Sequence, residues 1–256
     1  MEMGWSGWLA AALAVLLTGI SKSGFGGALS GLAVPVLALW MPTVDAVGVM
    51  LPILIAMDVL GLRVWRKAAS WPDLYWLLPA SLLGIAFGTA LLSLLDTRWC
   101  QLLIGLLAIA FALERCWQRW RVKIQTSDIR PGWLSVCCGA ASGMTSALAH
   151  AGGPPVMYYL LQRNLAKNTF VATMVVLFTG INLAKLPFYL GLGLINMQTL
   201  WMSLVLLPCV PAGVWLGVRC LQRVPEALFF RLAMLALMGT GLQLSWQALH
   251  ALGAVA

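Results

Sequence analysis

The feature that most constrains this sequence is a series of long apolar runs, separated by short loops that hold most of the charged residues. Only 9% of the 256 residues are charged and 61% are hydrophobic, whereas a water-soluble domain keeps roughly a quarter of its residues charged. Backbone amides in lipid must be hydrogen-bonded within their own segment, so each run is expected to form a helix. The sequence therefore predicts an all-α, polytopic integral membrane protein with about 8–10 membrane segments.

Two of the ten apolar runs are too short to cross a membrane as one helix. A helix needs roughly 20 residues to span the hydrocarbon, and the runs at 28–41 and 154–161 fall short of that length. We expect these two to be half-helices or re-entrant arms. The runs lie at about 5–20, 28–41, 44–62, 74–95, 99–116, 133–149, 154–161, 169–190, 199–218 and 227–249.

Glycine and proline interrupt the sequence just before each short run. Proline lacks an amide hydrogen and glycine has excess backbone freedom, so both disturb a continuous helix. We therefore predict two breaks in the helical backbone. The first break contains Gly24, Gly26 and Gly27, and the second contains His150, Gly152, Gly153 and Pro154.

The basic residues lie in loops, which is typical of membrane orientation and not of a nucleic-acid-binding face, although the net charge is +8. If the amino terminus is outside, the basic loops at 63–67, 115–130, 163–167 and 219–223 all fall in the cytoplasm. The first 17 residues lack a basic n-region, so we expect a retained helix and not a signal peptide. The chain is predicted to be a multi-pass protein of the cell inner membrane with both termini in the periplasm.

The sequence also indicates an internal duplication. A shift of 120 positions places Gly19 on Gly139, Pro35 on Pro155 and Ala46 on Ala166, and a shift of 129 places Pro79 on Pro208, Gly84 on Gly213 and Gly88 on Gly217. We predict a first transmembrane repeat at 1–120, a basic cytoplasmic linker at 121–131 and a second repeat at 132–256. Each half has an odd number of crossings, so the repeats are expected to be inverted relative to each other.

Interrupted helices at matching places of two inverted halves indicate a transport site near the membrane midplane. The unpaired amides and partial positive charge at the start of a half-helix favour an anion, and glycine lets it approach closely. Lys22 adds a full positive charge beside the first break. The alternative is that Lys22 extends to the cytoplasmic interface, as lysines near helix ends commonly do.

Lys185 lies deep in the run at 169–190, with Asn182 about one turn earlier on the same face. A cation at this depth is costly unless it is paired, solvated or faces a cavity. We therefore predict that Lys185 and Asn182 contribute to substrate binding. A structural ion pair of Lys185 is the alternative.

Two further titratable residues have open assignments. Asp58 lies well inside the run at 44–62, where it can carry a coupling proton or pair with Lys185, or form a local ion pair with Arg63 or Arg66. His150 stands at the second break and can titrate near neutral pH, or it is an outer-boundary residue hydrogen-bonded to freed backbone.

No motif in the chain indicates catalysis, a metal or a cofactor. The sequence contains no H-E-x-x-H, no G-x-S-x-G and no C-x-x-C, and its six cysteines are spread over the apolar runs. We expect no enzymatic activity, no catalytic residue and no bound cofactor.

The two glycine-rich segments resemble the paired motifs of the sulfite exporter TauE/SafE family, also called TSUP. They are Gly-Ile-Ser-Lys-Ser-Gly-Phe-Gly-Gly at 19–27, followed by Val34-Pro35, and the stretch from 143 that ends in Ala-Gly-Gly-Pro-Pro at 151–155. The resemblance implies transport of sulfur-containing anions such as sulfite, thiosulfate or organosulfonates in bacterial inner membranes. The second motif departs from the family's usual pattern by its extra proline and by the preceding His150, which puts the substrate choice in doubt.

These observations predict a secondary transporter that moves a small sulfur-containing anion through a site at the two helix breaks. Its expected partners are the anionic substrate, the lipid bilayer and a coupling proton or ion, while the oligomeric state and the transport direction stay open. The alternatives are an anion channel and a membrane assembly partner without carrier activity. A channel needs a continuous polar path or a ring of subunits, and this chain supplies only a few central polar residues.

Overall fold

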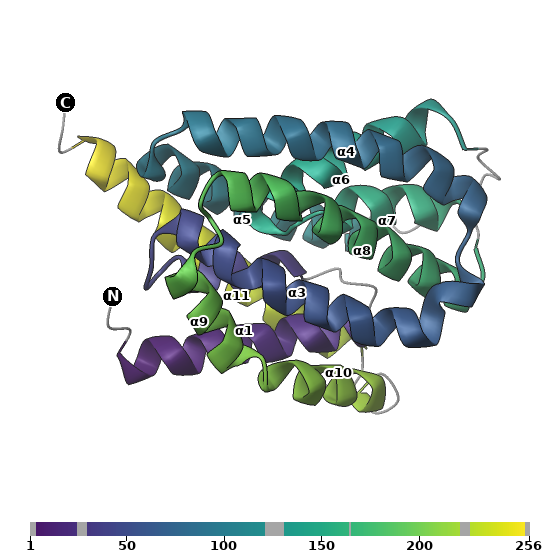
Figure 1. Cartoon of the computed structure of the whole chain (residues 1–256), viewed down its shortest axis with the longest axis horizontal. Coiled ribbons are helices and arrows are strands. Elements are labelled where there is room, and N and C mark those ends of the chain that lie inside the picture. Colours follow the sequence, from purple (N-terminus) through teal and green to yellow (C-terminus); the bar gives the residue numbers. More distant parts are fainter. Residues whose placement is uncertain (1–3, 25–29, 121–130, 164, 221–225, 254–256) are drawn as a thin grey trace.

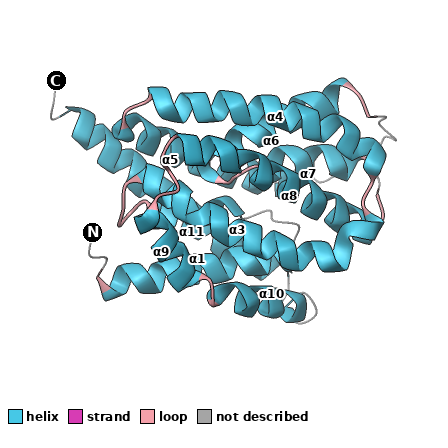
Figure 2. Cartoon of the chain, viewed as in Figure 1, coloured by secondary structure: helices cyan, strands magenta, loops and turns pink. Residues whose placement is uncertain are grey.

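The structure is a computed structural model that describes residues 4–24, 30–120, 131–163, 165–220 and 226–253. These residues form helices joined by short loops, with no strand among them (Figure 2), which confirms the predicted all-α fold. The elements in chain order are α1 (Trp5–Gly24), η1 (Ser30–Leu32), α2 (Ala33–Leu37), α3 (Thr43–Trp65), η2 (Arg66–Ala68), α4 (Trp71–Leu94), α5 (Thr97–Trp120), α6 (Trp133–Ala149), α7 (Gly153–Gln162), α8 (Lys167–Gly191), α9 (Met197–Leu206), α10 (Cys209–Cys220) and α11 (Glu226–Gly253).

Several helices are built to cross a membrane. In the described part of the chain, four helices are long and apolar enough to span it, and a fifth span results if α9 and α10 are counted as one. The four are α1, α3, α4 and α8. A multi-pass membrane protein is therefore confirmed. Residues 121–130 of the predicted linker at 121–131 lie outside the described residues, and its cytoplasmic placement stays a prediction.

Both predicted arms are short helices. The 5 residues of α2 and the 10 residues of α7 are far below the length that spans the hydrocarbon. Each arm follows a long helix whose end lies at a predicted break: α1 ends at Gly24, and α6 ends at Ala149. Ala33 and Gly153, the first residues of the two arms, are both buried, so the arms begin inside the protein.

The run at 199–218 is not one helix, as its uniform hydropathy had suggested, but the pair α9 and α10, bent by 48°. Pro208 stands in the break, and its missing amide hydrogen removes a bond from the helical ladder. The adjoining turns close with shorter-range bonds, from the Leu207 amide to the Leu204 carbonyl and from the Val210 amide to the Leu207 carbonyl. The missing amide hydrogen of Pro208 thus explains why this run forms two helices and not one.

The helices pack as two units that meet along α3 and α8 (Figure 1). We call α1, α2, α3, α9 and α10 the first packing unit, and α4, α6, α7 and α8 the second packing unit. Each unit contributes most of one hydrophobic cluster: Val15, Met50 and Leu206 belong to the first, whereas Leu77 and Leu160 belong to the second. Helices α5 and α11 pack against each other beside the two units.

The contacts within one unit correspond to those within the other. If α1–α5 are matched in order with α6–α11, with α9 and α10 together as the counterpart of α4, the pair α1 and α10 corresponds to α6 and α4. The pair α3 and α9 then corresponds to α8 and α4. The packing units differ from the sequence halves, since the first half contributes α4 to the second unit and the second half contributes α9 and α10 to the first. We propose that the predicted duplication underlies this exchange.

Glycines allow the closest of these helix contacts. A methyl group on Gly84 of α4 would collide with the carbonyl of Ala140 in α6 and lie 2.8 Å from the Met144 amide nitrogen. In the first unit, Gly19 of α1 meets the backbone of Gly213 in α10, 3.1 Å from where its own methyl group would be. Both pairs of helices therefore approach each other at backbone distance, as small residues permit in membranes.

We expect Gly84→Ala to destabilise the protein by about 1–3 kcal/mol, because the added methyl group can be accommodated only by separating α4 from α6. Gly191→Ala is the matched control, since Gly191 is exposed and no atom lies within 4 Å of its added methyl group. Thermal unfolding of both variants in detergent tests this. An unchanged midpoint for Gly84→Ala would show that the α4–α6 contact is not as tight as described.

Candidate functional site

Asp58 joins both packing units in the buried interior of the molecule. It lies on α3 with only 3% of its surface exposed, and its Oδ1 forms an ion pair with Nζ of Lys22 on α1. Its Oδ2 accepts a hydrogen bond of 2.6 Å from Nδ2 of Asn182 on α8. One carboxylate therefore connects three helices, and the bond to Asn182 crosses from the first packing unit to the second.

This arrangement corrects two expectations for Asp58 and one for Lys22. Asp58 pairs neither with Lys185 nor with Arg63 or Arg66, whose side chains are exposed at the end of α3 and in η2. Lys22 does not extend to the interface, since its side chain is only 11% exposed and turns toward Asp58. A buried carboxylate needs a charged partner, and Lys22 is the cation within reach.

Lys185 lies on α8, one turn beyond Asn182, and is fully buried. Its Nζ donates to the Ser146 carbonyl at 3.2 Å, to Ser146 Oγ at 3.0 Å and to His150 Nδ1 at 2.6 Å. Three acceptors match the three protons of an ammonium group. Among the described residues, no carboxylate oxygen lies within the 4.0 Å of an ion pair with Lys185, so the alternative of a structural ion pair is not what the structure shows.

His150 sits at the second break in a strained backbone conformation. Its φ of 52° places it in the left-handed region, the only non-glycine residue of the described chain with a positive φ. The conformation costs roughly 1–2 kcal/mol for a residue with a side chain, and it ends α6 so that the chain can turn into α7. His150 has only 2% of its surface exposed, and it contacts a backbone carbonyl, as one of the two alternatives had assumed.

The contacts of His150 fit one tautomer of the neutral ring. Nε2 lies 2.9 Å from the carbonyl oxygen of Val47 on α3, and a carbonyl can only accept, so Nε2 carries the hydrogen. Nδ1 faces the ammonium group of Lys185 and therefore presents its lone pair. The ring is then the neutral tautomer, and it links the second break to α3 of the first packing unit.

The backbone of the second break is buried and hydrogen-bonded to α6. Gly152, Gly153 and Pro154 are all buried, and the Gly152 carbonyl accepts a hydrogen bond of 2.7 Å from Ser142 Oγ on α6. Pro154 and Pro155 occupy the first turn of α7 and have no amide hydrogen. This half-helix start therefore offers fewer amides than an ordinary helix start, and Lys185 is the larger source of positive charge.

The first break is described only at its edges. Gly24 is the last residue of α1, whereas Gly26 and Gly27 lie outside the described residues, so the structure does not place them relative to Lys185. Lys22 lies two residues before Gly24, and it is the described residue near this break that contacts the buried polar residues around Asp58. We call this group of residues the central cluster. That cluster consists of Lys22, Asp58, Asn182, His150 and Lys185.

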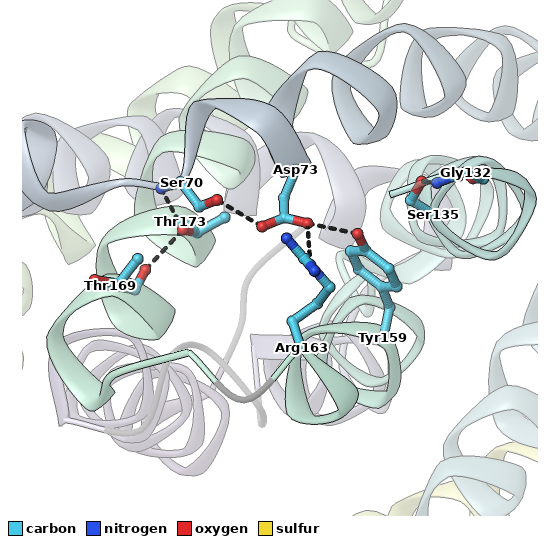
Figure 3. Close-up of polar contacts among 8 residues, drawn as sticks. All are labelled: Ser70, Asp73, Gly132, Ser135, Tyr159, Arg163, Thr169 and Thr173. Atoms are coloured by element: carbon cyan, nitrogen blue, oxygen red, sulfur yellow. Dashed lines mark hydrogen bonds and ion pairs between the residues drawn. The ribbon is translucent and has the colours of Figure 1, made fainter. Parts of the chain in front are cut away.

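A second buried polar cluster, which the sequence reasoning missed, surrounds Asp73 in the first turn of α4 (Figure 3). Asp73 is fully buried, and its Oδ1 accepts from Tyr159 Oη at 2.5 Å and from Arg163 Nε at 2.7 Å. Its Oδ2 accepts from Ser70 Oγ at 2.5 Å. The spacing of Ser70 and Asp73 is that of a capping box, and this signal marks Asp73 as the start of a helix.

The Asp73 cluster anchors the arm α7 at the end opposite to the second break. Tyr159 lies on α7 and Arg163 directly follows it, so both bonds hold α7 to α4. Ser70 extends the cluster to α8, because its amide donates to Thr173 Oγ1 at 2.9 Å (Figure 3). The arm is therefore fixed at both ends, by Asp73 at one and by the turn at His150 at the other.

We expect Arg163→Gln to destabilise the protein by about 3–5 kcal/mol, because it leaves a buried carboxylate without its cation. The double variant Asp73→Asn with Arg163→Gln should be less destabilised than the sum of the two single variants. Arg63→Gln, at an exposed arginine, is the matched control. Thermal unfolding of the four variants measures this, and strictly additive effects would show that the two residues do not act as a pair.

No metal centre is evident. Within the described part of the chain, no three His, Cys, Asp or Glu side chains gather closely enough to hold a metal ion. The central cluster instead combines cations, hydrogen-bond donors and one carboxylate, a composition that suits a small anion better than a metal.

Comparison with known proteins gives two matches. The family model described as sulfite exporter TauE/SafE matches residues 11–244. The probable inner membrane transporter protein TsaS of Comamonas testosteroni is 29% identical over 184 residues, which cover 70% of this chain and 74% of that protein. No solved structure gives a significant match.

Proposed function

We propose that this chain, which belongs to the sulfite exporter TauE/SafE family, carries a small anion of the sulfite, thiosulfate or organosulfonate class across the bilayer. Family membership and the likeness to an inner membrane transporter make the chain a multi-pass membrane transporter. The substrate class and the position of the site are our proposal. The basic loops support an orientation with both termini in the periplasm.

The observation that carries this proposal is the buried ammonium group of Lys185. An ammonium group in a low-dielectric interior is costly unless an opposite charge compensates it. Asp58 is already engaged by Lys22 and Asn182, and the contacts of Lys185 are neutral acceptors. A substrate anion is the natural partner for this charge, and it would take over one of the three contacts of Nζ.

The position of the cluster supports a carrier. Lys185 and Asn182 belong to the second packing unit, and Lys22 and Asp58 to the first, so a ligand between them would touch both units. Since Lys185 has no exposed surface, an anion reaches it only when the surrounding segments separate. Relative movement of two units around a central site is how inverted-repeat transporters give alternating access.

Each residue of the proposed site then has a distinct role. Lys185 binds the anion directly, His150 orients Lys185, and Asn182 and Lys22 hold Asp58 in place. Gly24 ends α1 at the first break, and Gly152, Gly153 and Pro154 let the chain turn at the second break, while Gly26 and Gly27 stay predicted site residues outside the described part of the chain. Asp58 is the candidate for carrying a coupling proton, because its protonation would release Lys22.

An anion channel or an assembly partner without carrier activity is the alternative function. Counterflow in proteoliposomes separates these cases, since only alternating access exchanges external for internal substrate against a gradient. Trapping labelled sulfite, thiosulfate or methanesulfonate under these conditions supports a carrier. A flux that follows the gradient without exchange supports a channel, and absence of any flux supports an assembly partner.

We expect Lys185→Met to weaken anion uptake by about ten- to hundredfold, the effect of removing a charged hydrogen-bond donor from a buried site. Lys67→Met is the matched control, because Lys67 lies exposed in η2. Uptake into proteoliposomes is the measurement, with size-exclusion chromatography to verify that the variant is folded. Uptake equal to that of the unmodified protein would remove Lys185 from the site.

A thermal-shift screen of the purified protein identifies the substrate class, because a ligand that prefers the native state raises its apparent stability. The screen compares sulfite, thiosulfate, sulfonates, sulfate and simple carboxylates. We expect a sulfur-containing anion to stabilise the protein at concentrations where the carboxylates do not. Stabilisation by carboxylates alone would contradict the proposed substrate class.

A further inference from the structure

We infer that the central cluster carries one net positive charge and therefore selects a monovalent anion over a divalent anion of the same size. This inference rests on the proposed function, since it assumes that the anion binds beside Lys185. It adds the charge of the substrate, which neither the family nor the helix breaks specify.

The charge follows from the contacts. Lys22 and Asp58 form an ion pair and cancel each other. His150 is neutral, because one ring nitrogen donates to the Val47 carbonyl and the other accepts from Lys185. Moving the shared proton from Lys185 to His150 would leave the sum of the two unchanged, so the cluster keeps one positive charge in either arrangement.

The surrounding elements add no further charge at contact distance. Asp45, in the first turn of α3, is the other acidic residue of that helix, and it makes no ion pair with Lys22 or Lys185. Asp73 lies at the far end of α7, paired with Arg163. Neither α6 nor α7 contains a charged residue within its bounds. Among the described residues, the net charge is therefore that of Lys185.

A single buried charge discriminates between anions through desolvation. The cost of moving an ion from water into a low-dielectric site grows with the square of its charge, whereas its attraction to one ammonium group grows only in proportion to the charge. A monovalent anion leaves the cluster neutral. A divalent anion costs about four times as much to desolvate, gains about twice the attraction and leaves an uncompensated negative charge.

Methanesulfonate and thiosulfate provide a matched pair of probes. Both have a sulfur bearing three oxygens, with a methyl group in one and a terminal sulfur of similar size in the other, but their charges are one and two. We expect the purified protein to bind methanesulfonate at least about tenfold more tightly than thiosulfate, measured by isothermal titration calorimetry. Equal affinities, or tighter binding of thiosulfate, would overturn the inference.

Charge variants test the cause of the preference. Asp58→Asn raises the net charge of the cluster by one and should shift the affinity ratio toward thiosulfate by about tenfold or more. The double variant Lys22→Gln with Asp58→Asn has the original net charge and should restore the preference for methanesulfonate. A ratio that is the same in all three proteins would show that shape and not charge determines the selection.

The outcomes also separate this inference from the function on which it rests. If the unmodified protein binds neither probe nor any anion of the thermal-shift screen, the proposed function fails. If it binds both probes with the same affinity, the transport site stands and only the charge selection fails. If Asp58→Asn does not fold, the affinities of the unmodified protein for the two probes still decide whether the site selects by charge.

Discussion

The arrangement of the centre depends on one carboxylate. Asp58 accepts from Lys22 and from Asn182, so a single buried charge sets the relative positions of α1, α3 and α8. In a membrane interior such a charge persists only when its partners stay in contact, which makes these bonds mutually dependent. The same pairing removes Asp58 as a counter-ion for Lys185. An ion pair that stabilises the fold thereby leaves a second cation available for a ligand.

The second break shows how irregular backbone is tolerated in the buried interior of this protein. Non-helical segments survive there only when protein groups satisfy their amides and carbonyls. Ser142 donates to the Gly152 carbonyl, His150 donates to the Val47 carbonyl, and the amides of His150 and Ala151 donate back to the last turn of α6. The left-handed turn at His150 is held by these bonds, and it places the imidazole directly against Lys185.

Hydropathy was sufficient to predict the class of fold, the short arms and the unusual position of Lys185 within an apolar helix, because each is a property of a single segment. The partners of Asp58 were not predictable in this way, since which face of α3 meets α1 depends on how distant helices pack. Asp73 was missed because it lies at the edge of an apolar run, where an exposed cap is the usual expectation, and only its contacts with Tyr159 and Arg163 make it buried. At Pro208 the local signal was present in the sequence, but the uniform hydropathy of the run at 199–218 obscured the bend between α9 and α10.

The exchange of helices between the two packing units also constrains how the protein is made. The ribosome delivers α4 to the membrane before α6, α7 and α8 exist, and it delivers α1 long before α10. Glycines such as Gly84 and Gly19 then lack their packing partners until the partner helices are synthesised. Neither unit is complete in the first half alone, so the full set of contacts in both units requires the second half of the chain.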